Sequence, residues 1–233
     1  MATRDDAKIA TESENSSLHA FMRAAGNRFA IHDSDIARKV AHVLANSSCY
    51  VPASTDVVGI NGFENLSSSS DGCQDVSDYS YIQQPSVTAM ESLIARLARY
   101  DDNLLELLSE CVADLCWRQA GFGKLPLSVR NKIFVVELIG PTGMYQYSEV
   151  RCGLLFQCEH VNYPWHKHAA EELYLIIDGH AGWAVNDALP TVKERGTFVH
   201  HKSMQPHSME TGANSLLALW GWTGDVNGDS YAL

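Results

Sequence analysis

The sequence is poor in basic residues and has no long apolar run. Its 17 lysines and arginines are outnumbered by 28 aspartates and glutamates, so the formal net charge is −11. Such a charge repels phosphate backbones, and we expect no nucleic-acid partner. The longest apolar runs, such as residues 215–222, are far shorter than the roughly 20 apolar residues of a membrane span. We therefore expect no membrane insertion. Because the first residues form no apolar stretch, we also expect no signal peptide and a cytoplasmic location.

Six cysteines are present, but no two have the Cys-x-x-Cys spacing of common zinc and redox motifs. A chain of 233 residues can bury an adequate core without disulfides. We therefore expect reduced thiols that act as small buried apolar groups. A hydrophobic content of 45% and a charged content of 19% are typical of a globular protein. The length suits one all-β domain with an extension, or two small domains.

The first half of the chain has a helical period after a polar start, residues 1–15, that we expect to be frayed. Helical spacing of apolar residues occurs in residues 18–29, 34–45, 86–100 and 102–121, with N-caps at Asp33 or Ser34 for the second and Asp101 or Asp102 for the fourth. A Ser/Asp-rich loop near residues 60–85 is either a lid over a site or a solvated linker. The apolar stripe from Leu104 to Leu115 requires a partner surface, which is either the outside of a sheet or a second subunit in a homodimer.

From Lys132 onward the period changes to two, as in β-strands. The expected strands are residues 133–139, 144–150, 153–160, 172–178, 181–185, 197–200, 207–210 and 216–222. Many short strands separated by turn signals indicate an antiparallel sandwich or barrel. The sequence therefore predicts a mainly β protein with a helical N-terminal region, residues 1–125, and a β-barrel domain, residues 126–233.

The candidate site lies in a strand–turn–strand segment, residues 163–179. Because alternate side chains of a strand share a face, His166 and His168 point the same way, and so do Glu172 and Tyr174. Two imidazoles and a carboxylate on adjacent strands form a mixed nitrogen and oxygen ligand set, which suits Zn, Fe, Mn, Ni or Cu. Such a site is either catalytic or purely structural.

Other polar residues are expected outside this site. Glu171 alternates to the opposite face and should be solvated. His200 and His201 are adjacent, so at most one faces inward, and we expect the pair either on the surface or directly behind the metal ligands. The remaining helical histidines, His19, His32 and His42, are interpreted as surface residues or hydrogen-bonded core residues.

The spacing of these residues resembles the motifs of the cupin superfamily. The first motif is matched by His166, His168, Glu172 and Gly179, and the second by Gly196 and His207. Three positions where the superfamily has Gly, Pro and Gly are occupied here by His160, Lys202 and Met204. The resemblance implies a small jelly-roll barrel with a metal in its mouth.

A narrower resemblance is to the cupin-type dimethylsulfoniopropionate (DMSP) lyases of the DddL/DddQ kind. It is carried by Tyr163, His166, His168, Glu172, Tyr174, His207 and Trp222. The resemblance implies one divalent transition metal per chain (Zn, Fe, Mn or Ni), with His168, Glu172, His207 and Tyr174 as ligands and His166 beside it. It also implies a small zwitterionic sulfonium substrate, cleaved by β-elimination to acrylate and dimethyl sulfide.

This chemistry gives the aromatic residues their expected roles. Tyr174 is the expected general base, and Tyr163 is the second candidate for proton handling. Trp222, and less directly Trp220, would hold the sulfonium by cation–π attraction, with Tyr163 and His166 also contacting the substrate. The alternative for Tyr174 is an ordinary core tyrosine, and for the tryptophans it is filling of the barrel.

Two other functions fit the same fold, because cupins host many activities. One is another metal-dependent cupin enzyme, such as a dioxygenase or an isomerase. The other is a non-enzymatic cupin that binds a ligand, although an intact ligand set and N-terminal helices without a basic face favour an enzyme.

Overall fold

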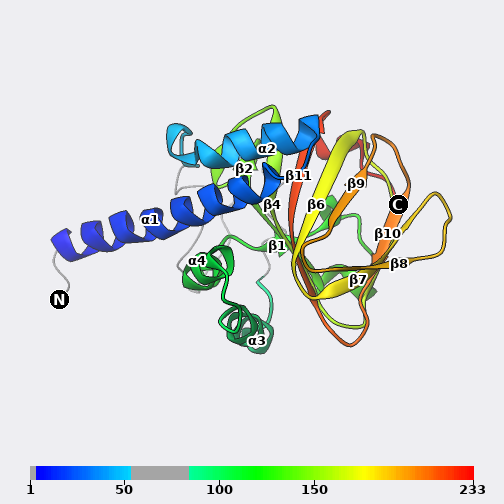
Figure 1. Cartoon of the computed structure of the whole chain (residues 1–233), viewed down its shortest axis with the longest axis horizontal. Helices are drawn as coiled ribbons and strands as arrows, with labels where there is room; N and C mark the ends of the chain where they lie inside the picture. The colour runs from blue at the N-terminus through cyan, green and yellow to red at the C-terminus, as the bar shows by residue number, and fades with distance from the viewer. Residues whose placement is uncertain (1–3, 54–83) are drawn as a thin grey trace, which may run out of the picture.

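The computed structural model describes residues 4–53 and 84–233, and it places the helices on one side of a two-sheet barrel (Figure 1). The long helix α1 (Arg4–Phe29) packs against α2 (Asp35–Ala45) and α4 (Asn103–Cys111), and α3 (Val87–Leu97) packs against α4. A single helical turn, α5 (Leu127–Arg130), comes directly before the first long strand of the barrel. The predicted loop near residues 60–85 lies outside the described residues, apart from its last two positions.

Side-chain caps begin three of these helices, and two of them, Ser34 and Asp102, were predicted. The Oγ atom of Ser34 accepts a hydrogen bond from Ala37 N at 3.2 Å. Ser86 and Asp102 cap α3 and α4 in the same way.

Two expectations about helix ends were wrong. Helix α1 already begins at Arg4, where we expected a frayed start, and its first turns are rich in good helix formers such as Ala, Lys and Glu. Helix α4 ends at Cys111, well before residue 121. At this end, Trp117 Nε1 donates to the Val112 carbonyl at 3.0 Å and satisfies one of the free acceptors of the helix.

The barrel consists of two mainly antiparallel sheets. The larger sheet has the order β1-β2-β4-β11-β6-β9, with the short β3 beside β2, and the smaller has the order β5-β10-β7-β8. The strands are β1 (Arg118–Gln119), β2 (Ile133–Gly140), β3 (Tyr145–Gln146), β4 (Val150–Gln157), β5 (Asn162–His166), β6 (Ala170–Asp178), β7 (His180–Val185), β8 (Thr191–Glu194), β9 (Phe198–His201), β10 (His207–Glu210) and β11 (Leu216–Gly224). The expected jelly-roll architecture is confirmed.

Strand positions differ from expectation in two places. The strand expected at residues 144–150 is only the two-residue β3, and the next strand begins at Val150, earlier than expected. Strands β1 and β8 were not predicted. Strand β8 is largely exposed, so its residues lack the alternation of apolar and polar side chains that identifies a half-buried strand.

Strand β6 separates two apolar clusters, as its alternation predicts. Leu173, Leu175 and Ile177 belong to the cluster that the large sheet forms with the helices. Tyr174 and Ile176 belong to the cluster inside the barrel. Helix and barrel residues thus share one core, and the domain boundary at residue 125 stays a prediction.

Helix packing covers the apolar stripe that suggested a dimer. Leu104, Leu108 and Leu115 are buried in the chain's own core. Helix α2 approaches β11 so closely that a Cβ added at Gly221 would lie 2.4 Å from Val40 Cγ2. The stripe therefore packs inside the chain, and the homodimer stays a prediction that no longer rests on it.

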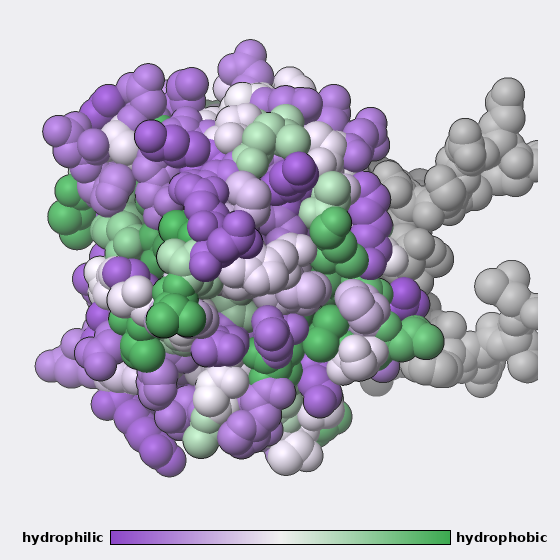
Figure 2. All heavy atoms as spheres, turned by 90° about the vertical axis from the view of Figure 1, so that its right-hand side faces the viewer, coloured by the Kyte–Doolittle hydropathy of each residue, from purple (hydrophilic) through white to green (hydrophobic). Residues whose placement is uncertain are grey.

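Figure 2 shows the barrel face, where polar residues dominate and apolar residues form small separate groups. None of the described helices combines the length and the apolar character needed to cross a membrane.

The described cysteines are free thiols, of which Cys111 and Cys152 are buried as expected, while Cys49 is exposed. Burial raises the pKa of Cys111 to about 12.

Candidate metal centre and active site

Three histidines predicted from the motif spacing come together inside the barrel. His166 at the end of β5 is the direct strand partner of His207 at the start of β10. Their ring centroids are 4.1 Å apart, and those of His168 and His207 are 5.2 Å apart. All three side chains are buried, and one ring nitrogen from each lies within 4.8 Å of the others.

The backbone determines which nitrogen of each ring faces the centre. Each Nδ1 is hydrogen-bonded to a carbonyl oxygen close in sequence: His166 to Pro164 (2.8 Å), His168 to Ala170 (3.0 Å) and His207 to Gln205 (2.8 Å). Because a carbonyl only accepts, each Nδ1 carries a hydrogen, and a neutral ring then has its lone pair on Nε2. Burial lowers the pKa of His166 to about 3, so this ring is neutral. Metal-binding histidines are commonly oriented by such bonds.

Glu172 brings a carboxylate to the same point. Its Oε2 lies 3.3 Å from His168 Nε2 and 3.2 Å from His207 Nε2. Burial acts to raise the pKa of Glu172, but the two imidazoles outweigh it and hold the pKa well below its usual range. Its other oxygen, Oε1, accepts a hydrogen bond from Trp222 Nε1 at 2.6 Å.

This arrangement fits a divalent metal ion. Lone pairs on the Nε2 atoms of His168 and His207 would face the negative oxygen of Glu172, so a proton or a cation must lie between them. Imidazole nitrogens with a carboxylate oxygen are the donors that zinc, iron, manganese and nickel accept. The buried donor set therefore matches the predicted type of ligand, and it leaves the identity of the metal open.

Two predicted tyrosines adjoin this centre. Tyr174 follows Glu172 by two residues on β6, and burial, followed by the charge of Glu172, raises its pKa well above the usual range. Tyr163 stacks on His166 with ring centroids 4.3 Å apart and an interplanar angle of 14°. Burial and the neighbouring phenols, Tyr231 first, raise the pKa of Tyr163 in the same direction.

A third phenol, Tyr231, was not predicted. Its hydroxyl donates to the hydroxyl of Tyr163 at 3.2 Å, and its ring stacks on His166 at 5.3 Å. It follows the short 3-10 turn Gly228–Ser230, in a stretch where the sequence offered only turn residues. No periodicity marks such a segment, because it reaches the site through long-range contacts.

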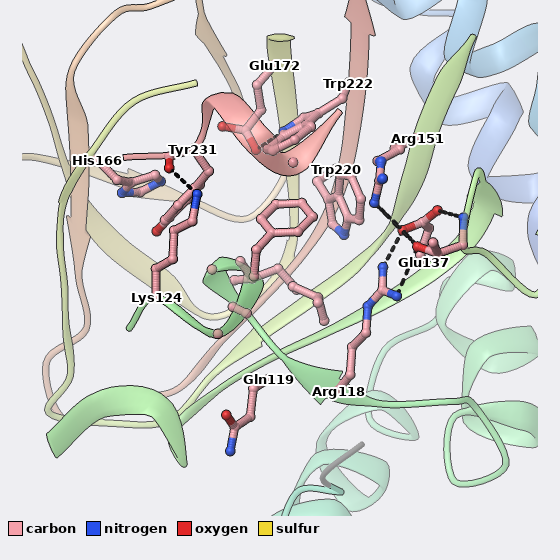
Figure 3. A pocket seen from close by; sticks show the side chains of 18 of the residues that line it. Arg118, Gln119, Lys124, Glu137, Arg151, His166, Glu172, Trp220, Trp222 and Tyr231 are labelled. Atoms are coloured by element: carbon pink, nitrogen blue, oxygen red, sulfur yellow. Dashed lines mark hydrogen bonds and ion pairs between the residues drawn. The ribbon is translucent and has the colours of Figure 1, made fainter. Parts of the chain in front are cut away.

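The centre opens into a cavity of about 460 Å³ (Figure 3). Among its lining residues are most of the predicted site residues, namely Tyr163, His166, Glu172, Tyr174, Trp220 and Trp222. The loop residue Phe122 lies over it, with ring centroids 5.7 Å from Trp222 and 5.8 Å from Tyr231. Phe122 has a φ of +50° and stands between two glycines, so this sharp turn was visible in the sequence only as a helix end.

A buried carboxylate and two arginines form another part of the cavity wall. Glu137 on β2 is bonded to Arg118 and, at 2.9 Å, to Arg151 Nη1, as Figure 3 shows. Thr142 N adds a hydrogen bond to Glu137 at 2.9 Å. No sequence motif reveals this cluster, since its members come from three separate segments.

The pair His200 and His201 divides as their alternation requires. His200 faces outward and is paired with Glu171 at 2.7 Å, so Glu171 is on the outer face as expected. His201 is completely buried beside His207, with ring centroids 4.0 Å apart. His201 therefore lies directly behind the predicted ligand His207, which is one of the two positions expected for the pair. Burial lowers the pKa of His201 to about 3.

The fold and the site together define a cupin-type barrel with a candidate metal centre. A family profile described as dimethylsulfoniopropionate lyase matches residues 65–218, which is more than half of the chain. The chain therefore belongs to the dimethylsulfoniopropionate lyase family. Tyr231, Trp220 and Trp222 lie beyond the matched residues.

Two curated proteins are similar in sequence. Dimethylsulfoniopropionate lyase DddQ of Ruegeria pomeroyi is 32% identical over 89 residues, which are 38% of this chain and 44% of the relative. A putative dimethylsulfoniopropionate lyase, DddL of Cereibacter sphaeroides, is 29% identical over 119 residues, which are 50% and 49% of the two chains. The chain thus spans about half the length of the curated relatives it matches.

Two solved structures extend the similarity in fold to nearly the whole chain. One comes from a study of the DMSP lyases RdDddP and RnDddQII, with a TM-score of 0.59, 19% identity and coverage of 94% of this chain and 98% of the other. The second, DddQ from Ruegeria pomeroyi, has a TM-score of 0.51, 19% identity and coverage of 87% and 97%. At this identity the likeness establishes the fold.

Proposed function

We propose that this protein is a metal-dependent DMSP lyase, which converts dimethylsulfoniopropionate into acrylate and dimethyl sulfide. The observation that carries the proposal is the convergence of three oriented imidazoles, the buried Glu172 carboxylate and two buried phenols on one cavity. Family membership points to the same reaction. The cytoplasmic location stays a prediction.

The proposed metal ligands are His168, Glu172 and His207, with His166 and Tyr174 next to the ion. When bound, one divalent transition metal (Zn, Fe, Mn or Ni) would supply a Lewis acid for the substrate carboxylate and for the negative charge that develops beside it. The residues around it hold the ligands in place: backbone carbonyls fix the imidazoles, and Trp222 Nε1 fixes the carboxylate.

We assign the role of general base to Tyr174. Its oxygen takes the proton from the carbon α to the substrate carboxylate, the electrons of that C–H bond form the new C=C bond, and the C–S bond breaks. The electron pair of the C–S bond leaves with the sulfur atom. The products are therefore acrylate, neutral dimethyl sulfide and a protonated Tyr174. Burial alone makes the phenol of Tyr174 a poor proton acceptor. A positive charge at the neighbouring Glu172 site favours the phenolate, which is why base and ligand set must be adjacent.

The sulfonium end of the substrate needs a partner that attracts a cation without a hydrogen bond. Trp222 is fixed through Nε1 by Glu172, and Trp220 lines the same cavity. An indole face contributes about 0.5–2 kcal/mol to the binding of a cation. We therefore propose that both tryptophans, with Tyr163 and His166, contact the substrate, and that Tyr163 is the alternative proton acceptor.

The test is headspace gas chromatography of dimethyl sulfide from purified protein and DMSP. The protein is first stripped of metal with a chelator and then supplied with Zn, Mn, Fe or Ni. We expect activity only with added metal, and a loss of about 100-fold or more in Tyr174→Phe and His207→Ala. Tyr147→Phe removes a phenol bonded to Glu149 outside the cavity and should keep full activity.

Other outcomes redirect the assignment. Loss in Tyr163→Phe with retention in Tyr174→Phe would transfer the base to Tyr163. No sulfide with any metal would remove the substrate assignment and point to another metal-dependent cupin reaction, such as oxygenation or isomerisation, or to ligand binding without catalysis.

A further inference from the structure

His201 is a buried histidine that the proposed ligand set does not use. It lies on β9 directly opposite Glu172 of β6, and directly paired residues of neighbouring strands project to the same face. None of its surface is exposed (0%). Within residues 4–53 and 84–233, neither Nδ1 nor Nε2 of this ring has a hydrogen-bond partner.

Such a residue is costly for the fold. Leaving a buried polar atom without a partner costs about 1–3 kcal/mol, whereas an apolar ring of the same shape would cost nothing of this kind. His166, His168 and His207 differ from it, because each has its Nδ1 tied to a backbone carbonyl. The nitrogens of His201 therefore require a partner that the described protein chain does not supply.

The surroundings of the ring indicate what that partner is. One face of His201 stacks on His207, with an interplanar angle of 10°. One nitrogen of His201, one nitrogen of His207 and one carboxylate oxygen of Glu172 all lie within 4.8 Å of one another. Glu172 and His207 are already assigned to the metal, so the unpaired imidazole stands at the edge of the same site.

We propose that His201 is an additional nitrogen donor of the metal centre, which shares the ion with Glu172 and His207. The inference rests on the metal centre of the proposed function and is independent of which substrate is cleaved. With His201 the metal centre contains four imidazoles, those of His166, His168, His201 and His207, together with the carboxylate of Glu172. Such a donor number suits ions that accept more than four ligands better than tetrahedral zinc.

The test is metal binding by the metal-free full-length chain, without any assay of activity. Isothermal titration calorimetry with Zn(II) gives the Kd, and the visible absorption of Co(II) reports the number and type of ligands. The decisive variant is His201→Phe, which keeps a ring against His207 and removes both nitrogens. The matched control is His200→Phe, since His200 is its outward-facing neighbour.

We expect His201→Phe to weaken metal binding by at least about tenfold and to change the Co(II) spectrum. His200→Phe should leave both within twofold of the wild type. The melting temperature of metal-free His201→Phe should equal or exceed that of the wild type, because two unpaired polar atoms have been removed. If His201→Phe does not fold, His201→Gln, which replaces the imidazole by a weakly ligating amide, takes its place.

The proposal is overturned if the variant binds both metals with wild-type affinity and an unchanged Co(II) spectrum. The ring of His201 would then serve only to pack against His207. His207→Ala separates this result from failure of the metal centre. If His207→Ala still binds metal, the whole proposed ligand set is refuted. If His207→Ala loses metal binding and His201→Phe keeps it, only the assignment of His201 as a donor is refuted.

Discussion

Lys167, which stands between the two histidines of the first motif, is hydrogen-bonded in both directions to Ala232. Lys167 N donates to Ala232 O, and Ala232 N donates to Lys167 O, each at 2.9 Å. Next to this bridge, Ala169 N donates to Ser230 Oγ at 2.9 Å. The segment that carries Tyr231 thus holds the backbone from which His166 and His168 project.

Replacing Ala232 by proline tests this backbone clamp. Proline has no N–H, so one of the two bonds to Lys167 is lost and the strand-like pairing is broken. We expect Zn(II) affinity, measured by competition with a chromophoric chelator, to fall about tenfold, as it does when outer partners of metal ligands are removed. Ala232→Val, which keeps the N–H, is the control and should bind zinc normally. Equal affinities in the two variants would show that the histidines hold their positions without the clamp.

The adjacent tryptophans Trp220 and Trp222 give a matched pair for the role of the indole N–H. Trp222 Nε1 donates to the Glu172 carboxylate, whereas Trp220 Nε1 is buried without a partner in the described part of the chain. A hydrogen bond to a charged group contributes about 1.5–3 kcal/mol, so Trp222→Phe should lower the free energy of unfolding by that order. Trp220→Phe removes no such bond and should have a clearly smaller effect in urea unfolding. A larger loss in Trp220→Phe would contradict the assigned network.

The core of the site could be predicted because its information is local. Alternation predicted that His166 shares a face with His168 and that Glu172 shares a face with Tyr174, and the distance from Gly196 to His207 identifies the second motif. The same alternation predicted that Leu173 and Leu175 face the helices, as they do. Such an alternation can be read from the sequence because the position of a residue within its strand determines the face of the sheet to which its side chain points.

The parts that could not be predicted depend on contacts between distant segments. Tyr231 reaches Tyr163 across 68 positions, and no local period records such a meeting. The choice between His200 and His201 depended on the register of β9 against β6, which a strand of four residues does not reveal. Phe122 required knowledge of a left-handed turn that its neighbouring glycines only suggest.

Stability of the helical layer should depend on pH through His19. Its Nδ1 contacts Ser47 Oγ at 2.9 Å and its Nε2 contacts Tyr145 Oη at 3.2 Å. Burial, with a smaller effect of Arg23, lowers the pKa of His19 below its usual 6.5. As the pH falls below 6.5, His19 therefore becomes protonated in the unfolded chain before it does in the folded chain. The free energy of unfolding then decreases as the pH falls, until the pKa of His19 in the folded state is reached.

His19→Asn should make the urea midpoint less sensitive to acidification below about pH 6.5 than it is in the wild type. A wild-type slope retained in His19→Asn would assign the acid sensitivity to other groups.

At two positions where the cupin motifs have glycine, this sequence has another residue, yet the backbone keeps the conformation that glycine favours. His160 has a φ of +54° and Met204 a φ of +59°, so both keep the left-handed backbone that glycine favours. Met204 N also donates to His168 O at 2.8 Å, which ties this loop to the metal centre.

Met204→Gly should consequently stabilise the protein. An L-residue in this region is strained by about 1–2 kcal/mol, and the greater freedom of an unfolded glycine offsets about 0.5–1 kcal/mol of the relief. We expect a net gain of about 0.5–1 kcal/mol, seen as a melting temperature about 2 °C higher in the metal-free protein. Lys202→Gly, in the same loop but with a negative φ, should instead be destabilising. A fall in melting temperature for Met204→Gly would mean that contacts of the methionine side chain outweigh the strain of its backbone.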